Sequence, residues 1–405
     1  MTSATGSVQR EVLPPPSERY TILGWLRKNL FSNWLSTILT LIFIPLIYFV
    51  GSSLLNWVLN VAEWAVIPAN WNLLMRGQYP AEEVWRLWLC IYLLAAVAGL
   101  GMGVWGQDFR VATLFAFAIP LLLMLIPWLS SQARLSLIFT AAIAIAFFVF
   151  GRFYPQRLNR VAFFALILYF PITILIVRGL GENSPILTYV PSNLWGGLLL
   201  SLLLAVVGIV FSFPLGVLLA LGRQSKLPAI KALSVMYIEF IRGVPLISLL
   251  FMAQVMFQFF MPVGFPTIDR ILRAMAAITL FSAAYTAENV RGGLQSIPNG
   301  QYEASHALGL NTFHTMTRII LPQALVAVIP VLVGQFISLF KDTSLVALVG
   351  LFDLLGIARS ILANPNWLGT HTEVFVVIAM IYWVFNFAMS SASRRLEITL
   401  GPNKH

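Results

Sequence analysis

Long apolar runs alternate with short polar segments along almost the whole chain. A helix that crosses a bilayer needs about 20 mostly apolar residues, because the hydrocarbon core is roughly 30 Å thick. Ten runs approach this length, and a span in lipid must form its own backbone hydrogen bonds. The pattern therefore predicts an all-α, polytopic transmembrane helical bundle. The predicted spans lie at about 36–58, 87–105, 111–130, 135–151, 161–178, 195–222, 235–261, 272–292, 323–341 and 373–391.

The composition agrees with a membrane bundle. Hydrophobic residues make up 59% of the 405 positions and charged residues only 10%, whereas a soluble domain has about 25% charged residues. The net charge of +10 comes from basic residues in short loops, which is typical of a topology signal and not of nucleic-acid binding. Cys90 is the single cysteine and the four histidines show no ligand spacing, so we expect neither a disulfide nor a metal site.

The basic residues also predict the orientation. With a cytosolic N-terminus, sixteen Lys and Arg residues fall inside the membrane boundary and seven outside, and cytoplasmic loops are the ones enriched in these residues. We therefore expect cytosolic tails at 1–34 and 396–405, and a cytosolic segment at 293–322. The first 34 residues lack a short apolar core followed by a cleavage site, so we expect no cleaved signal peptide.

The distribution of charge divides the chain near residue 190. The predicted spans of residues 35–190, about five helices, carry few charges, whereas those of residues 191–395 carry several. Ionisable groups at membrane depth are costly, which leaves two interpretations open: a solute path, or a lock between helices.

Two of these charged pairs lie near expected cytosolic ends of spans. Glu239 with Arg242, and Glu288 with Arg291, are each three residues apart and so share one helix face. We favour a gate or structural role for both pairs.

A polar run ends the ninth predicted span. Lys341, Asp342, Thr343 and Ser344 offer groups of both signs, which a zwitterionic solute needs. The alternative is a structural contact between Lys341 and Asp342 that caps the helix.

The segment between the eighth and ninth spans has a distinct pattern. A short amphipathic helix is predicted after Pro298-Asn299-Gly300, with a break at Gly309 and a second helical piece that ends at Pro322. Glycine permits backbone turns that other residues resist, and proline is tolerated in the first turn of a helix. An ordinary loop helix on the membrane surface is the alternative, and it would need no particular residue at Glu303 or Gly309.

The spacing of this segment resembles the EAA motif of bacterial ATP-binding-cassette (ABC) importer permeases. Glu303 and Ala304 are followed by Gly309, then by Leu321 and Pro322. Ser305 departs from the pattern, because the family usually has a second alanine there. The resemblance implies a coupling helix that docks into a groove on a separate ATPase. In that role Glu303 would meet basic groups, while Ala304 and Gly309 would allow close approach.

Three further segments are similar to polar amino-acid permeases of the histidine/glutamine type: 237–246, 287–298 and 341–345. They lie within residues 191–395, which implies the five-helix core of a type I ABC importer. Residues 24–31, with Tyr79-Pro80 near Trp85-Arg86, resemble the longer general L-amino-acid permeases (AapM/BztC-like). The resemblance implies import of polar or general L-amino acids across the inner membrane. The implied partners are a related second permease, an ATPase dimer, a periplasmic amino-acid-binding protein and membrane lipid.

The chain itself has no ATP-binding loop of the Walker A kind. Such a loop needs Gly-Lys followed by Ser or Thr, and none of the five lysines follows a glycine. We therefore expect ATP and Mg²⁺ to be bound by the partner ATPase, and no cofactor here. An ion-coupled secondary transporter or channel would leave the EAA spacing unexplained. A membrane-embedded enzyme would need a convergent catalytic cluster, which the sequence lacks, and an exporter would normally lack the motif.

Overall fold

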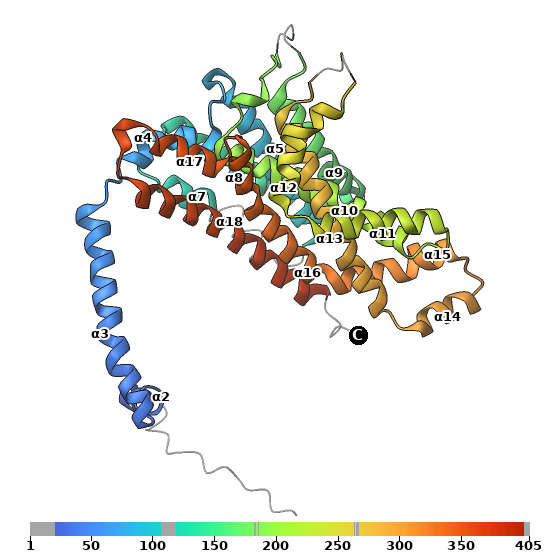
Figure 1. Cartoon of the computed structure of the whole chain (residues 1–405), viewed down its shortest axis with the longest axis horizontal. Helices are drawn as coiled ribbons and strands as arrows, with labels where there is room; N and C mark the ends of the chain where they lie inside the picture. The colour runs from blue at the N-terminus through green and yellow to red at the C-terminus, as the bar shows by residue number, and fades with distance from the viewer. Residues whose placement is uncertain are drawn as a thin grey trace, which may run out of the picture. The chain divides into compact units, whose positions relative to one another are not determined.

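The computed structural model describes residues 21–106, 119–181, 184, 186–262, 264 and 267–400. The chain forms two compact units, which meet between Trp64 and Ala65. Helices make up nearly all of the regular structure in both units (Figure 1).

The described part of the first unit, from residue 21 on, contains the α-helices α2 (Ile22–Asn29) and α3 (Trp34–Asn56). A π-helical turn, η1 (Trp57–Val61), extends α3. The side chain of Asn33 accepts a hydrogen bond from the Ser36 amide (2.7 Å) and so caps the start of α3. Apolar side chains surround α3 on all sides, as expected for a helix in lipid.

The second unit begins with a group of helices that precede the predicted core. They are α4 (Val66–Arg76), η2 (Ala81–Glu83), α5 (Val84–Trp105), α7 (Ile119–Met124), α8 (Ser131–Phe153) and α9 (Pro155–Arg178). Helix α5 packs closely against α8. A Cβ atom built on Gly99 would lie 2.3 Å from the Ala144 carbonyl oxygen, and one on Gly103 would lie 2.3 Å from that of Phe148. Small residues allow this approach, which drives helix association in lipid through van der Waals packing.

This contact predicts that Gly103→Val destabilises the protein. The new side chain has no room beside α8, so the two helices must separate, at a cost of about 1–3 kcal/mol. Gly101→Val is the matched control, because a Cβ at Gly101 meets only the Trp105 ring, at 3.2 Å. Thermal unfolding of the purified protein should show a lower midpoint for Gly103→Val alone. Equal midpoints for the two variants would show that the α5–α8 contact is not tight.

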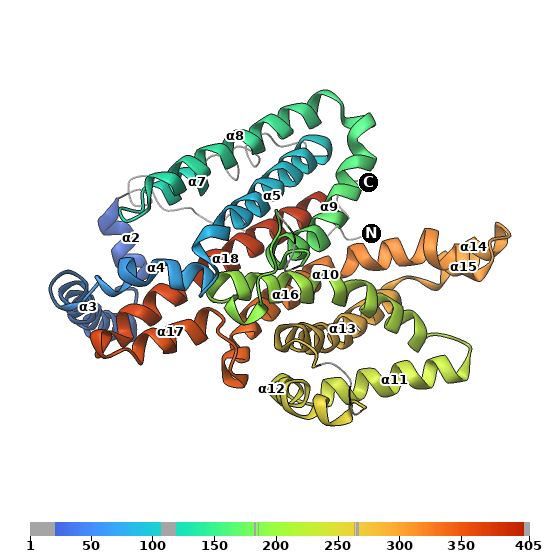
Figure 2. The ribbon, with the colours of Figure 1, turned by 90° about the horizontal axis from the view of Figure 1, so that it is seen from above.

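The remaining helices form the core. They are η4 (Ser192–Leu194), α10 (Gly197–Arg223), α11 (Pro228–Gly243), α12 (Leu246–Phe251), η5 (Met252–Met256), η6 (Phe257–Phe260), α13 (Arg270–Ser296), α14 (Asn299–Ala307), α15 (Thr312–Thr315), η7 (Met316–Ile320), α16 (Leu321–Asp342), η8 (Thr343–Val349), α17 (Leu354–Leu362), η9 (Pro365–Trp367) and α18 (His371–Leu400). Helix α10 lies against α13, and α13 lies against α16. Figure 2 shows these helices running beside one another.

The second unit runs across the composition change near residue 190. One buried apolar cluster contains Val177 from α9 together with Leu204 of α10 and Phe340 of α16. The buried Arg86 of α5 donates to the carbonyl oxygen (2.7 Å) and hydroxyl (2.8 Å) of Thr188. The helices before residue 190 are therefore packed into the same body as those after it.

Seven described helices are long and apolar enough to cross a membrane, or eight if one bent pair counts as a span. These eight coincide with eight of the ten predicted spans. Helix α13 coincides with one more predicted span, 272–292. It is not counted among the seven because its charged side chains lower its mean hydropathy. The predicted span 111–130 lies partly outside the described residues, and α7 is the helix seen from residue 119 on.

The predicted span 235–261 is wrong as a single straight helix. Helix α11 ends at Gly243 and α12 begins at Leu246, with a bend of 105° between the two halves. Pro245 explains the bend, because a proline ring pushes the preceding residue out of the helical region. Val244 accordingly has extended dihedral angles, φ −110° and ψ 133°.

Two short buried helices, α4 and α17, were not predicted, because both are too short to resemble spans. Asp353 caps α17 by accepting hydrogen bonds from the Gly356 (2.9 Å) and Leu355 (3.2 Å) amides. Burial raises the pKa of Asp353 to about 7. Bridges Gly77↔Trp195 and Gly197↔Asp353 bring the start of α10 beside both helices. We call this the bridge end of the second unit, and the end that carries residues 299–320 the loop end.

Candidate functional site

The segment with the EAA spacing folds as predicted in its first half. Helix α14 starts directly after Pro298, and the chain turns at Gly309, whose φ of +75° favours glycine. Glu303, Ala304 and Gly309 are all exposed. Ser305, in contrast, is only 1% exposed, and its hydroxyl donates to the Gln301 carbonyl oxygen (2.6 Å). The departure from the family pattern therefore lies on the inner face of α14.

The second half of the segment differs from the prediction. The helix that starts at Thr312 does not end at Pro322 but continues through α16 as one long helix. A proline removes one amide donor and crowds the preceding turn. The wider π-helical turn η7, directly before α16, makes room for the ring. Leu321 is half-buried, whereas Pro322 is exposed.

The loop is attached to the core by a buried apolar cluster. Ile320 and Ala324 pack with Val290 and Leu294 of α13, and Tyr302 of α14 packs against the same cluster. The exposed face of α14 is thus connected to the helices α10, α11, α13 and α16 by a close-packed interior. Such an interior transmits displacement instead of absorbing it.

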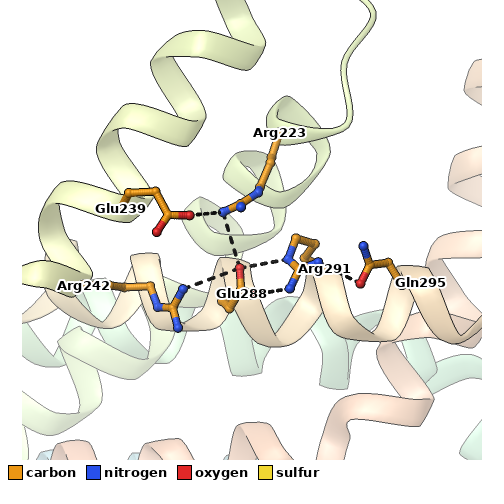
Figure 3. Close-up of polar contacts among 6 residues, drawn as sticks. All are labelled: Arg223, Glu239, Arg242, Glu288, Arg291 and Gln295. Atoms are coloured by element: carbon orange, nitrogen blue, oxygen red, sulfur yellow. Dashed lines mark hydrogen bonds and ion pairs between the residues drawn. The ribbon is translucent and has the colours of Figure 1, made fainter.

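A charge cluster lies on α13 next to this loop (Figure 3). Glu288 bonds Arg291 on its own helix through both carboxylate oxygens. It also contacts Arg223 of α10 (3.5 Å) and Arg242 of α11 (3.8 Å). Arg223 in turn pairs with Glu239 of α11 (2.8 Å). One carboxylate therefore joins three helices at the loop end.

The two pairs of charges that were predicted to share a helix face differ in their contacts. Glu288 and Arg291 interact as their spacing predicts, but Glu239 and Arg242 take partners on other helices. Helix α11 packs against both α10 and α13, so its two side chains reach across to those helices. Arg223 was missed, because its place at the end of a span suggested only a topology signal.

A cavity of about 410 Å³, lined by both apolar and polar side chains, lies between α12, α13 and α16, beside the charge cluster. Gln335 of α16 crosses it: its side-chain oxygen accepts from Asn289 (2.5 Å) and its amide nitrogen donates to Ser282 and Thr286. Arg242 stacks on Tyr285, with 5.7 Å to the ring centroid. The lining side chains are Leu246, Ile278, Phe281, Ser282, Tyr285, Asn289, Val331, Gly334, Gln335, Ser338, Leu339 and Asp342.

The side chains of the four residues predicted for a solute path lie in different surroundings. Asp342 lines the cavity, whereas Lys341 is exposed and does not. Thr343 is buried, and its hydroxyl donates to the Phe340 carbonyl oxygen (2.7 Å). Ser344 is half-buried and does not line the cavity. The polar side chains opposite Asp342 are neutral amides and hydroxyls instead of a lysine.

Helix α13 links the cavity, the charge cluster and the exposed loop in chain order. Its residues from Ile278 to Asn289 line the cavity, Glu288 and Arg291 form the charge cluster, and α14 follows after two residues. A helical membrane bundle with a cavity that carries several polar side chains, and with an exposed loop of EAA spacing, defines a transport subunit of the permease class.

Comparison with known proteins agrees with this class. Residues 212–399 match the family described as "Binding-protein-dependent transport system inner membrane component". The inner membrane amino-acid ABC transporter permease protein YhdY of Escherichia coli K12 is 38% identical, over 92% of this chain and 91% of that protein. The glutamate/glutamine/aspartate/asparagine transport system permease protein BztC of Rhodobacter capsulatus is 39% identical, over 98% of both. A solved amino-acid ABC transporter is 30% identical over 50% of this chain and 92% of its own, with a TM-score of 0.45.

The chain therefore belongs to the family of binding-protein-dependent transport system inner membrane components. It is a multi-span permease subunit of an ABC transporter and not itself an enzyme. The resemblance seen in the EAA spacing is confirmed.

Proposed function

We propose that this permease imports polar or general L-amino acids, with its loop end in the cytosol. The observation that carries the proposal is the cavity beside the charge cluster on α13. Its volume of about 410 Å³ lies in the range of small-molecule sites. Asp342 offers an anion for an α-ammonium group, and Gln335 and Ser338 offer neutral donors for a carboxylate. The names of the two full-length relatives, both amino-acid permeases, support this substrate class.

The complex that we propose contains partners that bind at opposite ends. An ATPase dimer, which binds ATP and Mg²⁺, docks on the exposed face around Glu303, Ala304 and Gly309. A periplasmic amino-acid-binding protein delivers the substrate at the bridge end, and a related second permease completes the pathway. ATP binding then favours one of two states of the bundle, and hydrolysis returns it to the other.

The charge cluster is the part of the permease that we propose as a gate. It joins α10, α11 and α13 between the cavity and the docking face, so any opening of the loop end must alter its contacts. If two permease states differ in these contacts, the equilibrium between them responds both to substrate in the cavity and to the ATPase at the loop end. Coupling between two sites requires such a shared equilibrium.

The test is uptake of a labelled amino-acid panel by cells with and without the chain, with ATP and the proton gradient depleted separately. Gly334→Leu is the informative variant, because Gly334 lines the cavity and a Cβ there meets nothing within 4 Å. We expect the leucine to fill the cavity and to lower uptake at least about tenfold. Unfolding of the helix would not explain such a loss, because leucine has a higher helix propensity than glycine. Gly51→Leu, at a helical glycine with equally open surroundings outside the cavity, should leave uptake unchanged.

Two results would contradict the proposal. Uptake that follows the proton gradient after ATP depletion would indicate an ion-coupled transporter. Normal uptake by Gly334→Leu would show that the substrate does not pass through this cavity.

A further inference from the structure

The turn between α8 and α9 carries an exposed basic and aromatic patch that the transport site does not use. Arg152, Arg157 and Arg160 are exposed there. Phe153 is 75% exposed and Tyr154 50% exposed. All five residues fall within nine positions around the end of one span and the start of the next. We call these five residues the turn patch.

A third aromatic residue is brought to the turn patch from another helix. Trp105 ends α5, and its indole N–H donates to the side-chain oxygen of Asn159 in the first turns of α9 (2.6 Å). The Trp105 ring stays about half exposed. Trp and Tyr gather where a membrane meets water, so this contact indicates that the turn patch lies at headgroup depth.

The arginines of the turn patch lie in a stretch of sequence without carboxylates; Asp108, just before it, lies outside the described residues. The sequence contains no Asp or Glu from residue 109 to residue 181. Within the described part of the chain, the ion pairs found involve none of these three arginines. The charge cluster on α13 is the opposite case, because Glu288 and Glu239 lie among its arginines. Among the described residues these exposed arginines are therefore open to an anion from outside the chain.

We infer that the turn patch binds the phosphate of an anionic phospholipid. Arginine matches phosphate geometry through paired N–H donors, and the exposed Phe153 and Tyr154 suit the acyl-chain boundary beside a headgroup. The chain path puts the patch at the loop end: α5 runs from Arg86, near Thr188, to Trp105, and α9 runs back. Figure 2 likewise draws the α8–α9 turn toward α14 and α15. The lipid lies in the leaflet next to the proposed ATPase.

Basic loops that serve only as topology signals need no bound lipid, and a matched pair of variants separates the two roles. Arg157→Gln with Arg160→Gln removes two charges early in α9, a helix that begins with Pro155. Lys226→Gln with Lys231→Gln removes two exposed charges around the start of α11, which begins with Pro228. Both pairs lie at loop-end helix starts, so their effects on topology should be alike.

The experiment measures phosphatidylglycerol retained by the purified full-length protein, by native mass spectrometry and by titration into phosphatidylcholine nanodiscs. We expect wild type and the lysine variant to bind phosphatidylglycerol over phosphatidylcholine. The arginine variant should bind it at least about tenfold more weakly, since the charge-assisted hydrogen bonds from each arginine to the phosphate are lost. Cysteine-accessibility mapping should show unchanged topology in both.

Three outcomes would overturn the inference. Binding at the wild-type level by both variants would leave the turn patch a topology signal, and a similar loss in both would indicate non-specific surface charge. Competition by free inorganic phosphate at equal concentration would indicate a phosphate site and not a lipid site. Lipid binding is measured without any uptake assay. A negative result would therefore overturn this inference and leave the proposed transport function unaffected.

Discussion

Gly309→Trp is expected to reduce ATP-driven uptake to the level of cells that lack the chain, while the protein still inserts and folds. Gly309 lies at the turn between α14 and α15 on the exposed side of the loop, and a Cβ there meets nothing within 4 Å. A side chain at this position therefore starts in open space and stands on the surface proposed for the ATPase. Close approach of the partner is then blocked, and co-purification of the ATPase should be lost together with uptake.

Two further variants separate blocked docking from backbone strain. Gly369 also has a positive φ, +93°, and equally open surroundings, but it lies before α18 at the bridge end. Gly369→Trp should therefore keep the ATPase bound. Gly309→Ala carries the strain of a left-handed residue without the bulk, and should lower uptake only modestly. Normal uptake by Gly309→Trp would contradict the docking assignment, and a full loss in Gly309→Ala would assign the defect to strain.

The sequence predicts the spans well because lipid imposes a simple length rule. It also predicts the turn at Gly309, since only glycine suits the backbone there. It fails where a local break lies inside an apolar run: Val244 and Pro245 bend a predicted span by 105°. Pro245 was visible in the sequence, but a hydropathy pattern alone does not register a proline inside an apolar run. Helices α4 and α17 were missed because they are shorter than any span.

The site shows the same division between local and tertiary information. Glu239, Arg242, Glu288 and Arg291 are conspicuous as charges in apolar surroundings, but their partners depend on how α10, α11 and α13 pack. No spacing along the chain could place Arg223 beside Glu288, which lies 65 residues later. Gln335 was overlooked because it is uncharged, although a polar amide inside an apolar run is itself costly in a membrane. That cost is the signal that would have marked it.

The second large effect is expected from Glu288→Gln, which removes the carboxylate that three arginines share. The side chain keeps its shape, but Arg223, Arg242 and Arg291 are left facing one another without their common anion. Hydrogen bonds to charged groups contribute about 1.5–3 kcal/mol. Because the Glu288 side chain is 22% exposed, solvent screening weakens these hydrogen bonds. We therefore expect the free energy of unfolding to fall by about 1–2 kcal/mol. Uptake should fall roughly tenfold, because the cluster lies between the cavity and the ATPase face.

Glu239→Gln is the matched control for this prediction. Its carboxylate is 53% exposed, and among the described residues the ion pair found for it is with Arg223, so its loss should cost about 0–1 kcal/mol. Thermal unfolding and uptake of both variants therefore give a graded expectation, and equal effects would contradict a central role for Glu288. Adding Arg242→Gln to Glu288→Gln removes one unpaired cation and should restore part of the stability. If uptake stays low in that double variant while stability returns, the cluster acts in gating and not only in holding the helices together.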